Sequence, residues 1–389
     1  MKIGLVLPYN IAKGGGVKEV VLALHDGLVK KGHDVTIITP QPREPYEHDD
    51  RTVLFLGTAA DFKMPSTTGQ ISASMMTDEI DAMLEEQEFD ILHFHEPWVP
   101  VLSRQILSRS RTVNVATFHS KLPETLVSRT MAKVITPYTK PLLRYIDAFT
   151  APSDAAAEYV RSLSPVEVQI IPNGIDLQHF RPSSKPAKIV ADKKGALTIL
   201  YVGRLEKRKG VNYLLSAFKL MLERLPNVHL VLAGDGVDRE KLEDQVAELQ
   251  LESHVTFLGF VSEAKKLELL QTADLFCSPA IYGESFGIVL LEAMASGLVT
   301  VAGNNPGYES VMQDLGKLSL IDPKDTSAFA HRLQLLLTEN DLRSLWKKWA
   351  KETVRKYDYP RVINRYEAAY EAALERKTEL SRHSDAEAA

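Results

Sequence analysis

The sequence contains one cysteine, Cys277, in 389 residues. A single cysteine excludes a disulfide within the chain and every metal site built from several cysteines. This usage fits a reducing compartment, and we expect a cytoplasmic protein. Cys277 lies in a short apolar run, where a buried thiol acts as a small hydrophobic residue.

Long apolar runs are also missing. No segment approaches the roughly 20 apolar residues that a membrane-spanning helix needs. The first apolar stretch, residues 3–7, is about one strand long and runs directly into Pro8, unlike a signal peptide. The sequence therefore predicts a protein that is soluble or, at most, peripheral at the inner face of a membrane.

Basic residues are not in excess. The chain has 46 Lys and Arg against 51 Asp and Glu, a net charge of -5. General nucleic-acid binding needs a net basic surface, so we expect no nucleic-acid partner. The apolar content of 44% and charged content of 25% are those of a folded globular protein, and the length predicts two domains.

Short β-branched runs alternate with helical patterns in two series, separated by a polar segment at 181–195. This alternation predicts the α/β class, with two Rossmann-like doubly wound domains. We place the domains at 1–172 and 173–356, followed by a helical segment at 357–378 that returns to the first domain and a disordered tail at 379–389. The active cleft should lie between the domains, at the carboxyl ends of the strands. The expected strands are 2–7, 34–39, 89–94, 112–118, 148–152, 168–171, 197–202, 228–233, 255–258, 274–278 and 298–302.

Glycines follow the first expected strand at positions 14, 15 and 16. The free amides of such a turn, at the start of a helix, suit an anion such as a phosphate, although a flexible turn has the same composition. The run is not a dinucleotide fingerprint, because Glu19 occupies the position of the third glycine and no acid closes the second strand. A nicotinamide oxidoreductase is therefore disfavoured.

Arg204 and Lys209 lie in the loop after the strand that ends near Gly203. Two cations in a strand-to-helix loop suit a diphosphate, whose charge they neutralise. A solvated basic loop is the alternative interpretation.

Two carboxylates, Glu284 and Glu292, flank seven residues where another helix begins. At 3.6 residues per turn they lie on nearly the same side of that helix. The amides around Phe286, Gly287 and Ile288 are free to face a phosphate. Carboxylates accept hydrogen bonds from sugar hydroxyls, so Glu284 could hold a hexose and Glu292 a ribose. A capping acid with an unrelated surface Glu is the alternative.

These motifs together resemble glycosyltransferase family 4, a group of retaining enzymes with the GT-B fold. Within that family the chain is most similar to the phosphatidylinositol mannosyltransferases. The family resemblance also includes Ile171-Pro-Asn-Gly-Ile-Asp176, followed by Phe180, and Gly234-Asp-Gly236. The motifs that carry the similarity to the mannosyltransferases are Pro8-Tyr9, Gly15-Gly16-Val17, His93-Phe-His95-Glu-Pro97, Ala116-Thr-Phe-His119, Gly283-Glu-Ser-Phe-Gly-Ile-Val-Leu290 and Lys356-Tyr-Asp358.

The resemblance implies transfer of a hexose, with mannose favoured, from a nucleoside diphosphate sugar such as GDP-mannose. The implied acceptor is a phosphatidylinositol-type lipid; a soluble or other glycan acceptor is the alternative, and a nucleotide-sugar epimerase or sensor is less favoured. The implied site residues are Gly15, Gly16, Arg204 and Lys209 at the diphosphate, Glu284 and Glu292 at the sugars, Phe286, Gly287 and Ile288 at the donor, Lys266 near the nucleoside, His119 beside the transferred sugar and Tyr9 at the acceptor.

We expect no metal and no cofactor. His93, His95 and His119 could be interpreted as metal ligands, because alternate strand residues share a face. However, the chain has no Asp-x-Asp, the usual metal-diphosphate anchor of the other glycosyltransferase fold. Leaving-group charge would then be stabilised by Arg204, Lys209 and helix N-termini.

A basic segment suggests contact with an anionic membrane. Residues 78–96 contain eight acids and no Lys or Arg, whereas 97–146 contain eight Lys or Arg and one acid. Four of these cations would share a stripe of about 60° on a helix, able to face anionic lipid. A solvated helix face is at least as good an interpretation, and Pro137 and Pro141 could interrupt the helix. The four are Arg129, Lys133, Lys140 and Arg144.

Overall fold

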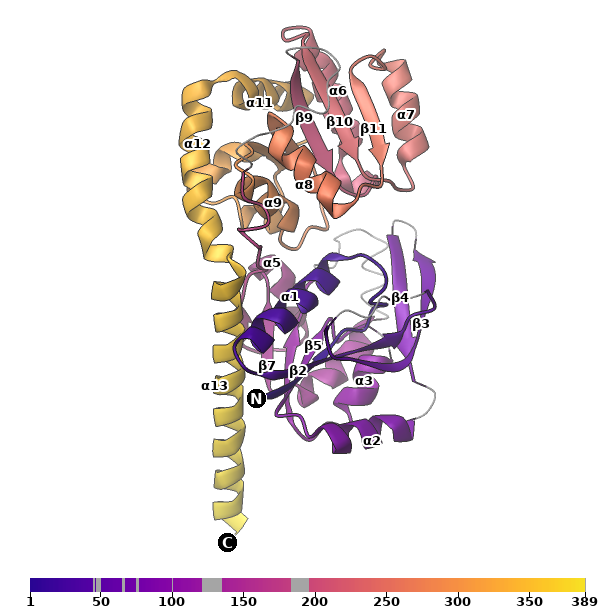
Figure 1. The fold of residues 1–389 in the computed structure, drawn as a ribbon, viewed down its shortest axis with the longest axis vertical. Helices are drawn as coiled ribbons and strands as arrows, with labels where there is room; N and C mark the ends of the chain where they lie inside the picture. The colour runs from indigo at the N-terminus through magenta and orange to yellow at the C-terminus, as the bar shows by residue number, and fades with distance from the viewer. Residues whose placement is uncertain are drawn as a thin grey trace. The chain divides into compact units, whose positions relative to one another are not determined.

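The chain forms two α/β units in a computed structural model that describes residues 1–44, 46, 50–64, 67–74, 77–99, 101–120, 135–182 and 196–388. The first unit comprises Met1–Gly174 and Tyr359–Ala389, and the second comprises Ile175–Asp358. The first unit therefore ends two residues beyond the predicted position 172, and the second two residues beyond 356. Figure 1 shows the elements of each unit.

The first unit is built on an eight-stranded sheet with the order β4-β3-β2-β1-β5-β6-β7-β8. All neighbouring strands are parallel except β3 and β4. The strands are β1 (Lys2–Val6), β2 (Asp34–Gln41), β3 (Val53–Met64), β4 (Thr67–Ala73), β5 (Ile91–His95), β6 (Val113–Thr117), β7 (Ala148–Ala151) and β8 (Val168–Ile170).

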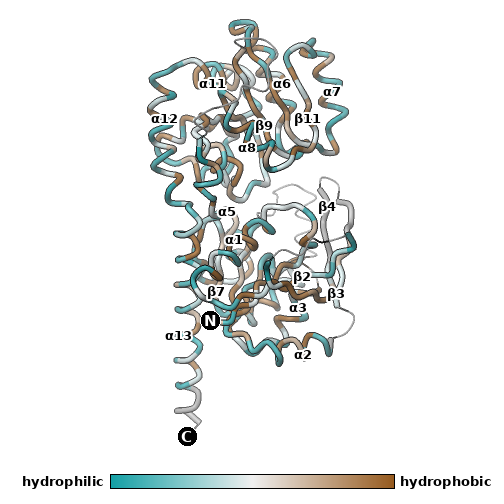
Figure 2. Tube along the Cα trace, in the orientation of Figure 1, coloured by the Kyte–Doolittle hydropathy of each residue, from teal (hydrophilic) through white to brown (hydrophobic). Residues whose placement is uncertain are grey.

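Helices cover both faces of this sheet because its strands are apolar on both sides. Ile3 and Leu5 of β1 enter one core with α1 (Gly16–Lys30) and α13 (Tyr359–Ala388), whereas Val6 enters the other. That second core is covered by α2 (Thr77–Gln87), α3 (Leu102–Leu107) and α5 (Asp154–Leu163). Figure 2 shows hydrophobic residues running along the strands.

The antiparallel pair β3 and β4 departs from the expected parallel sheet. Thr58 pairs with Ala73 at one end of the ladder, and Met64 with Thr67 at the other. Only two residues separate the strands, a length that suits a hairpin, whereas a parallel connection needs a crossover of a dozen residues or more.

The second unit contains a parallel six-stranded sheet with the order β11-β10-β9-β12-β13-β14. Its helices share one continuous core with the strands. The strands are β9 (Leu197–Val202), β10 (Val228–Ala233), β11 (Val255–Gly259), β12 (Leu275–Ser278), β13 (Thr300–Gly303) and β14 (Leu320–Ile321). The α-helices are α6 (Val211–Leu222), α7 (Arg239–Glu248), α8 (Glu263–Thr272), α9 (Ile288–Ala295), α10 (Pro306–Glu309), α11 (Thr326–Thr338) and α12 (Asn340–Thr353).

The C-terminal helix α13 continues to Ala388, where the sequence predicted a disordered tail from residue 379. The polarity of this tail favoured disorder in the sequence prediction. However, residues 375–388 consist mostly of good helix formers and contain no Gly or Pro. Upstream, α13 places Tyr366 and Tyr370 in the core of the first unit.

The predicted basic stripe is only partly within the described residues. Arg129 and Lys133 lie outside them, while Lys140 and Arg144 are exposed in the 3-10 helix η1 (Lys140–Tyr145). An α-helical stripe therefore does not run through Lys140, because a tighter 3-10 helix begins at that residue, with Pro141 in its first turn. None of the helices in the described part of the chain is long and apolar enough to span a membrane.

Each sheet has one point where the strand order reverses. In the first unit this switch point lies between β1 and β5, and in the second between β9 and β12. Doubly wound sheets bind ligands at such points, beside the carboxyl ends of the strands. We therefore expect a ligand site in the loops that follow β1, β5, β9 and β12.

Candidate functional site

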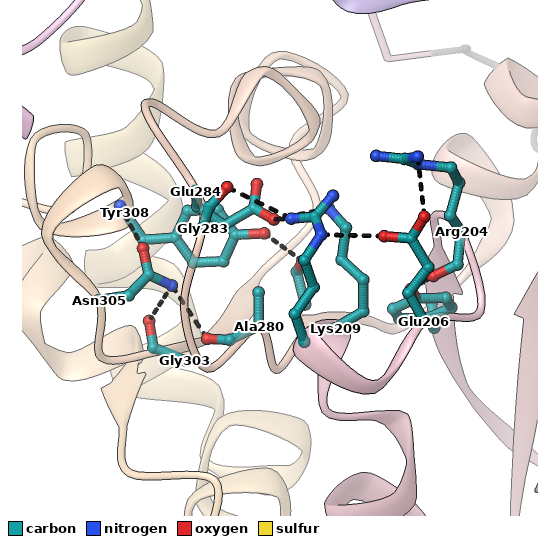
Figure 3. A network of polar contacts seen from close by, with 12 residues as sticks. Arg204, Glu206, Lys209, Ala280, Gly283, Glu284, Gly303, Asn305 and Tyr308 are labelled. Atoms are coloured by element: carbon teal, nitrogen blue, oxygen red, sulfur yellow. Dashed lines mark hydrogen bonds and ion pairs between the residues drawn. The ribbon is translucent and has the colours of Figure 1, made fainter. Parts of the chain in front are cut away.

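The loops after β9 and β12 bring together a cluster of five charged side chains. Glu284 accepts through Oε1 from Lys209 Nζ at 2.7 Å and from an Arg208 guanidinium nitrogen at 2.7 Å. Glu206 contacts Arg204 at 2.8 Å and Arg208 at 2.9 Å. Figure 3 shows Glu284 facing Lys209 and Glu206 beside Arg204. The cluster thus alternates in sign, with three cations against two carboxylates.

Close backbone packing holds the two loops in register. The Ile281 amide donates to the Arg208 carbonyl at 2.8 Å. Gly210, at φ 70°, has a left-handed backbone, and a Cβ there would approach the Pro279 carbonyl oxygen to 2.2 Å. Glycine is required at this position, both for the conformation and for the approach of the loops. This contact brings the basic loop against the loop that carries Glu284.

Most of the cluster is shielded from solvent. Side-chain exposure is 7% for Glu206, 12% for Glu284, 14% for Lys209 and 15% for Arg208, but 56% for Arg204. Burial lowers the pKa of Lys209, although Glu284 opposes that shift. Burial also acts on Arg208, but Glu284 and Glu206 outweigh it and raise its pKa. Lys209 and Arg208 are consequently charged groups in a setting of low dielectric constant, where their electrostatic attraction for an anion is stronger than in water.

The second carboxylate of the Glu-x-seven-Glu run has a different partner. Glu292 accepts from Lys266 at 2.9 Å, and the Lys266 ammonium lies 5.7 Å from the centre of the Phe180 ring. Burial would lower the pKa of Lys266, but Glu292 and Glu263 raise it. The structure therefore joins the predicted nucleoside residue Lys266 to the predicted ribose residue Glu292.

Helix α9, which carries Glu292, begins at Ile288, after the N-cap residue Gly287. Glu284 lies in the loop before this helix. Gly287 has φ 108°, and a Cβ there would lie 2.7 Å from the ring of Tyr308. Phe286 is buried and packs edge-on against Tyr357, with ring centres 5.8 Å apart. The tight turn is thus fixed by packing, and the first amides of α9 have no helical acceptor in the preceding turn.

The residues predicted to meet the acceptor and the transferred sugar follow the strands at the switch point of the first unit and the neighbouring strand β6. Tyr9 follows β1, Glu96 follows β5 and His119 follows β6. Gly15 is the N-cap residue of α1, and a Cβ on it would meet no atom within 4 Å. Gly15 therefore leaves space in front of the N-terminus of α1, where Gly16 is the first helical residue, and such a place suits an anion.

Three buried histidines, His93, His95 and His119, lie at the carboxyl ends of β5 and β6. His95 Nδ1 and His119 Nε2 are 2.8 Å apart. Both ring nitrogens of His93 contact hydroxyls, Tyr370 at 2.7 Å and Thr117 at 2.6 Å. Burial lowers the pKa of His93 and of His119 to about 3 and lowers that of His95 as well. Within the described residues, no three His, Cys, Asp or Glu side chains are grouped as a metal site would require.

Glu96 is an acid in the same setting. Burial raises its pKa to about 7, although hydrogen bonds from Ser120, Trp98 and nearby backbone amides oppose the shift. The charge of Glu96 in turn adds to burial in raising the pKa of Tyr9. Tyr9, Glu96 and His119 thus belong to one electrostatic neighbourhood.

Comparison with known proteins agrees with this arrangement. The family model for glycosyltransferase family 4 matches residues 14–179, and that for glycosyl transferases group 1 matches residues 185–353. The chain is 32% identical over 373 residues to the phosphatidyl-myo-inositol mannosyltransferase of Mycolicibacterium smegmatis, covering 95% of this chain and 94% of that protein. The chain belongs to glycosyltransferase family 4. It is also 31% identical to the Mycobacterium tuberculosis phosphatidyl-myo-inositol mannosyltransferase, covering 95% of this chain and 97% of that one.

Solved structures show the same fold for this glycosyltransferase. Sucrose-phosphate synthase from Thermosynechococcus elongatus superposes with a TM-score of 0.74 at 21% identity, covering 99% of each chain. Anabaena HepE in complex with UDP-glucose superposes with a TM-score of 0.74 at 16% identity, covering 96% of this chain and 100% of that one. The predicted GT-B fold class is confirmed, and the enzyme is a hexosyltransferase.

Several residues of the candidate site were not singled out from the sequence. Arg208 and Glu206 complete the charged cluster, and Glu96 completes the buried group of the first unit, in which His95 had been considered only as a metal ligand. An acid inside the otherwise basic run 204–209 was a usable signal for Glu206. Nothing in the run distinguished Arg208, which points to Glu284, from Lys207, which is exposed.

Proposed function

We propose that this glycosyltransferase moves mannose, with retention at the anomeric carbon, from GDP-mannose to a phosphatidylinositol-type lipid. Mannose and the lipid acceptor follow the names of the relatives, which are phosphatidyl-myo-inositol mannosyltransferases of similar length. GDP as the nucleotide follows the motif resemblance to the same group of enzymes. Transfer from a nucleotide-sugar donor in general is supported by the fold, since HepE was solved with UDP-glucose.

The observation that carries the proposal is the charged cluster at the switch point of the second unit. A diphosphate brings two or more negative charges, and Arg204 with Lys209 supplies cations in the loop that such a ligand meets. The free amides at the start of α9 add donors on the adjoining loop. Glu284 contacts Lys209, so Glu284 can bind a sugar hydroxyl while Lys209 binds the adjoining phosphate.

The chemistry that we propose breaks the bond between the anomeric carbon and the diphosphate oxygen. Negative charge grows on the leaving phosphate, and Arg204, Lys209 and the α9 amides stabilise it most in the transition state. The acceptor oxygen attacks from the face that the phosphate leaves, and a phosphate oxygen takes its proton. Glu284 binds the sugar and does not attack it, and His119 orients a sugar hydroxyl.

Metal-free stabilisation is part of the same proposal. The three cations of the cluster are held within 3 Å of carboxylates that fix their positions, so little reorganisation is needed when the phosphate departs. Divalent metal would then add nothing that the cluster lacks.

The test is product analysis with purified enzyme. GDP-mannose, GDP-glucose, UDP-glucose and UDP-N-acetylglucosamine, each radiolabelled in the sugar, are offered with phosphatidylinositol vesicles or with free inositol phosphate. We expect label in lipid with GDP-mannose alone, and an α-linked product by NMR. Label in free inositol phosphate but not in lipid would replace the lipid with a soluble acceptor, and transfer from a UDP-sugar alone would overturn the donor.

Membrane contact by the basic segment is a separate proposal. Lys140 and Arg144 are exposed and would add to binding by about 1 kcal/mol each on an anionic surface. Sedimentation with anionic and neutral vesicles tests this in wild type and in K140E/R144E. Equal binding of both proteins to anionic vesicles would remove these residues from the membrane contact.

A further inference from the structure

We propose that His95 is a positioning residue that fixes the His119 imidazole as the tautomer with its proton on Nδ1. His119 then presents only a hydrogen-bond donor at that nitrogen. The inference deepens the proposed function, because that function assigns His119 to the transferred sugar. Its central measurement, however, needs neither donor nor acceptor.

The two histidines come from neighbouring parallel strands. His95 is the last residue of β5 and pairs in register with Thr117, the last residue of β6. His119 lies two residues further along the chain. The rings are nearly parallel, with centres 5.1 Å apart, and His95 Nδ1 lies 2.8 Å from His119 Nε2. That distance is a hydrogen bond between two ring nitrogens.

Each ring carries one proton. His95 and His119 are buried, and burial lowers the pKa of both far below neutrality. A neutral imidazole has one N–H donor and one bare acceptor nitrogen. The shared hydrogen bond can therefore form in only two ways: His95 donates from Nδ1, or His119 donates from Nε2.

The other nitrogen of His95 decides between these two arrangements. His95 Nε2 is buried and has no hydrogen-bond partner among the described residues. If His119 donated, the proton of His95 would sit on this nitrogen, as a buried N–H without an acceptor. If His95 donates from Nδ1, its Nε2 is only a bare acceptor, and the His95 ring has no unpaired N–H. The second arrangement avoids burying an unpaired N–H, so it is the one we assign.

The neighbouring His93 keeps the His95 ring from turning. The centres of these two rings are 4.1 Å apart. His93 is itself held at both nitrogens, by Tyr370 of α13 and by Thr117 of β6. A flip of the His95 ring would put Cδ2 in the place of Nδ1 and break the hydrogen bond to His119, and it must displace a side chain fixed from two elements. The tautomer of His119 is thus set by packing that begins at the C-terminal helix.

The consequence for chemistry is a defined role for His119. Its Nε2 accepts from His95, and its Nδ1 carries the proton. At Nδ1 the residue can donate to a sugar or phosphate oxygen but cannot remove a proton. This matches a reaction in which the departing phosphate takes the acceptor proton, and it separates His119 from a general base.

The first experiment reads the tautomer directly in the full-length protein. Protein labelled with ¹⁵N-histidine is examined at pH 7.5 by long-range ¹H–¹⁵N correlation, which distinguishes Nδ1–H from Nε2–H rings. The 11 histidines are assigned with the aid of H119Q and H95N. We expect both His95 and His119 as Nδ1–H. A His119 spectrum of the Nε2–H form, or of an imidazolium, overturns the proposal.

The second experiment uses two substitutions of equal size at position 95. The Asn amide can donate to His119 Nε2 as His95 does, whereas an Asp carboxylate can only accept and selects the Nε2–H form or an imidazolium. We expect kcat for mannosyl transfer to be at least about tenfold higher in H95N than in H95D, with GDP affinity by calorimetry equal in both. Equal kcat values in two folded variants contradict the proposal. An Nδ1–H ring at His119 in a protein that transfers no mannose would leave the tautomer assignment standing and overturn the proposed function instead.

Discussion

The two switch points occupy equivalent places in their sheets but carry opposite kinds of side chain. In the second unit the loops after β9 and β12 hold charged groups in direct contact, from Arg204 to Glu284. In the first unit the end of β5 and the loop after β6 hold the imidazoles of His95 and His119, which burial keeps neutral, beside Glu96, whose pKa burial raises to about 7. This contrast fits the function proposed above, in which the charged groups of the second unit bind the diphosphate and the neutral side chains of the first unit meet the reacting hydroxyls.

The largest effect should come from removing a cation of the second unit. Lys209→Ala should reduce kcat/KM for transfer by about three orders of magnitude, because it removes charge stabilisation that grows in the transition state. Lys207→Ala is the matched control, since Lys207 is exposed two residues away. Similar rates in the two variants would end the assignment of the diphosphate to Lys209.

A smaller loss should follow from Arg208→Gln, because Arg208 acts by holding Glu284 and Glu206 in place. We expect kcat/KM to fall by about ten- to a hundredfold. In a double-mutant cycle, Arg208→Gln should cost less than about twofold when Glu284 is already Gln. Fully additive losses would show that Arg208 acts on the ligand independently of Glu284.

The neutral character of the first unit predicts a pH effect on stability. The pKa of Glu96 is raised from an ordinary 4.5 to about 7, so the unfolded chain releases this proton first. The buried Glu96 carboxyl therefore does not lower the free energy of unfolding below about pH 4.5. It lowers that free energy increasingly between pH 4.5 and 7, and by its full amount above pH 7. Glu96→Gln should therefore raise the free energy of unfolding at pH 8 by about 3 kcal/mol more than at pH 4.5, as measured by urea denaturation. An equal change at both pH values would mean that Glu96 is not held neutral by burial.

The smallest expected effect is that of chelator. If the cations of the second unit supply the charge stabilisation, transfer should stay within about twofold of the untreated rate in EDTA. If activity is lost in EDTA and restored by Mn²⁺ or Mg²⁺, charge stabilisation would be assigned to a metal instead. That result would weaken the contrast between the two switch points.

How far the sequence could predict this structure differs from region to region. Strands β9 and β10 have the predicted bounds, because each is a short apolar run between polar loops. The hairpin of β3 and β4 was not predicted, since β4 is polar and carries no comparable apolar run. Local pattern is sufficient for a buried parallel strand but not for an edge hairpin.

The site shows the same limit. Arg204, Lys209 and Glu284 were named from separate motifs, but the contact of Lys209 with Glu284 depends on two loops that are 75 residues apart. Which cation of the Lys207-Arg208-Lys209 run turns inward depends on the short helix η2 (Lys207–Lys209) and on Gly210. His95 was noted only with His93 and His119 as a possible metal ligand, because its hydrogen bond to His119 needs the register of β5 and β6. Residue types could be predicted, and their pairing could not.

The division of the chain also determines the order in which the enzyme can be made. The second unit is inserted between Gly174 and Tyr359 of the first, and its two ends meet where the Ile175 amide donates to the Tyr357 carbonyl at 2.8 Å. During synthesis the second unit is complete before the ribosome reaches α13. The first unit must wait for that helix, because Tyr366 and Tyr370 fill its core and Tyr370 holds His93. The half of the protein that is translated first is therefore finished last, and the His95–His119 pair can be locked only after the C-terminal helix has docked.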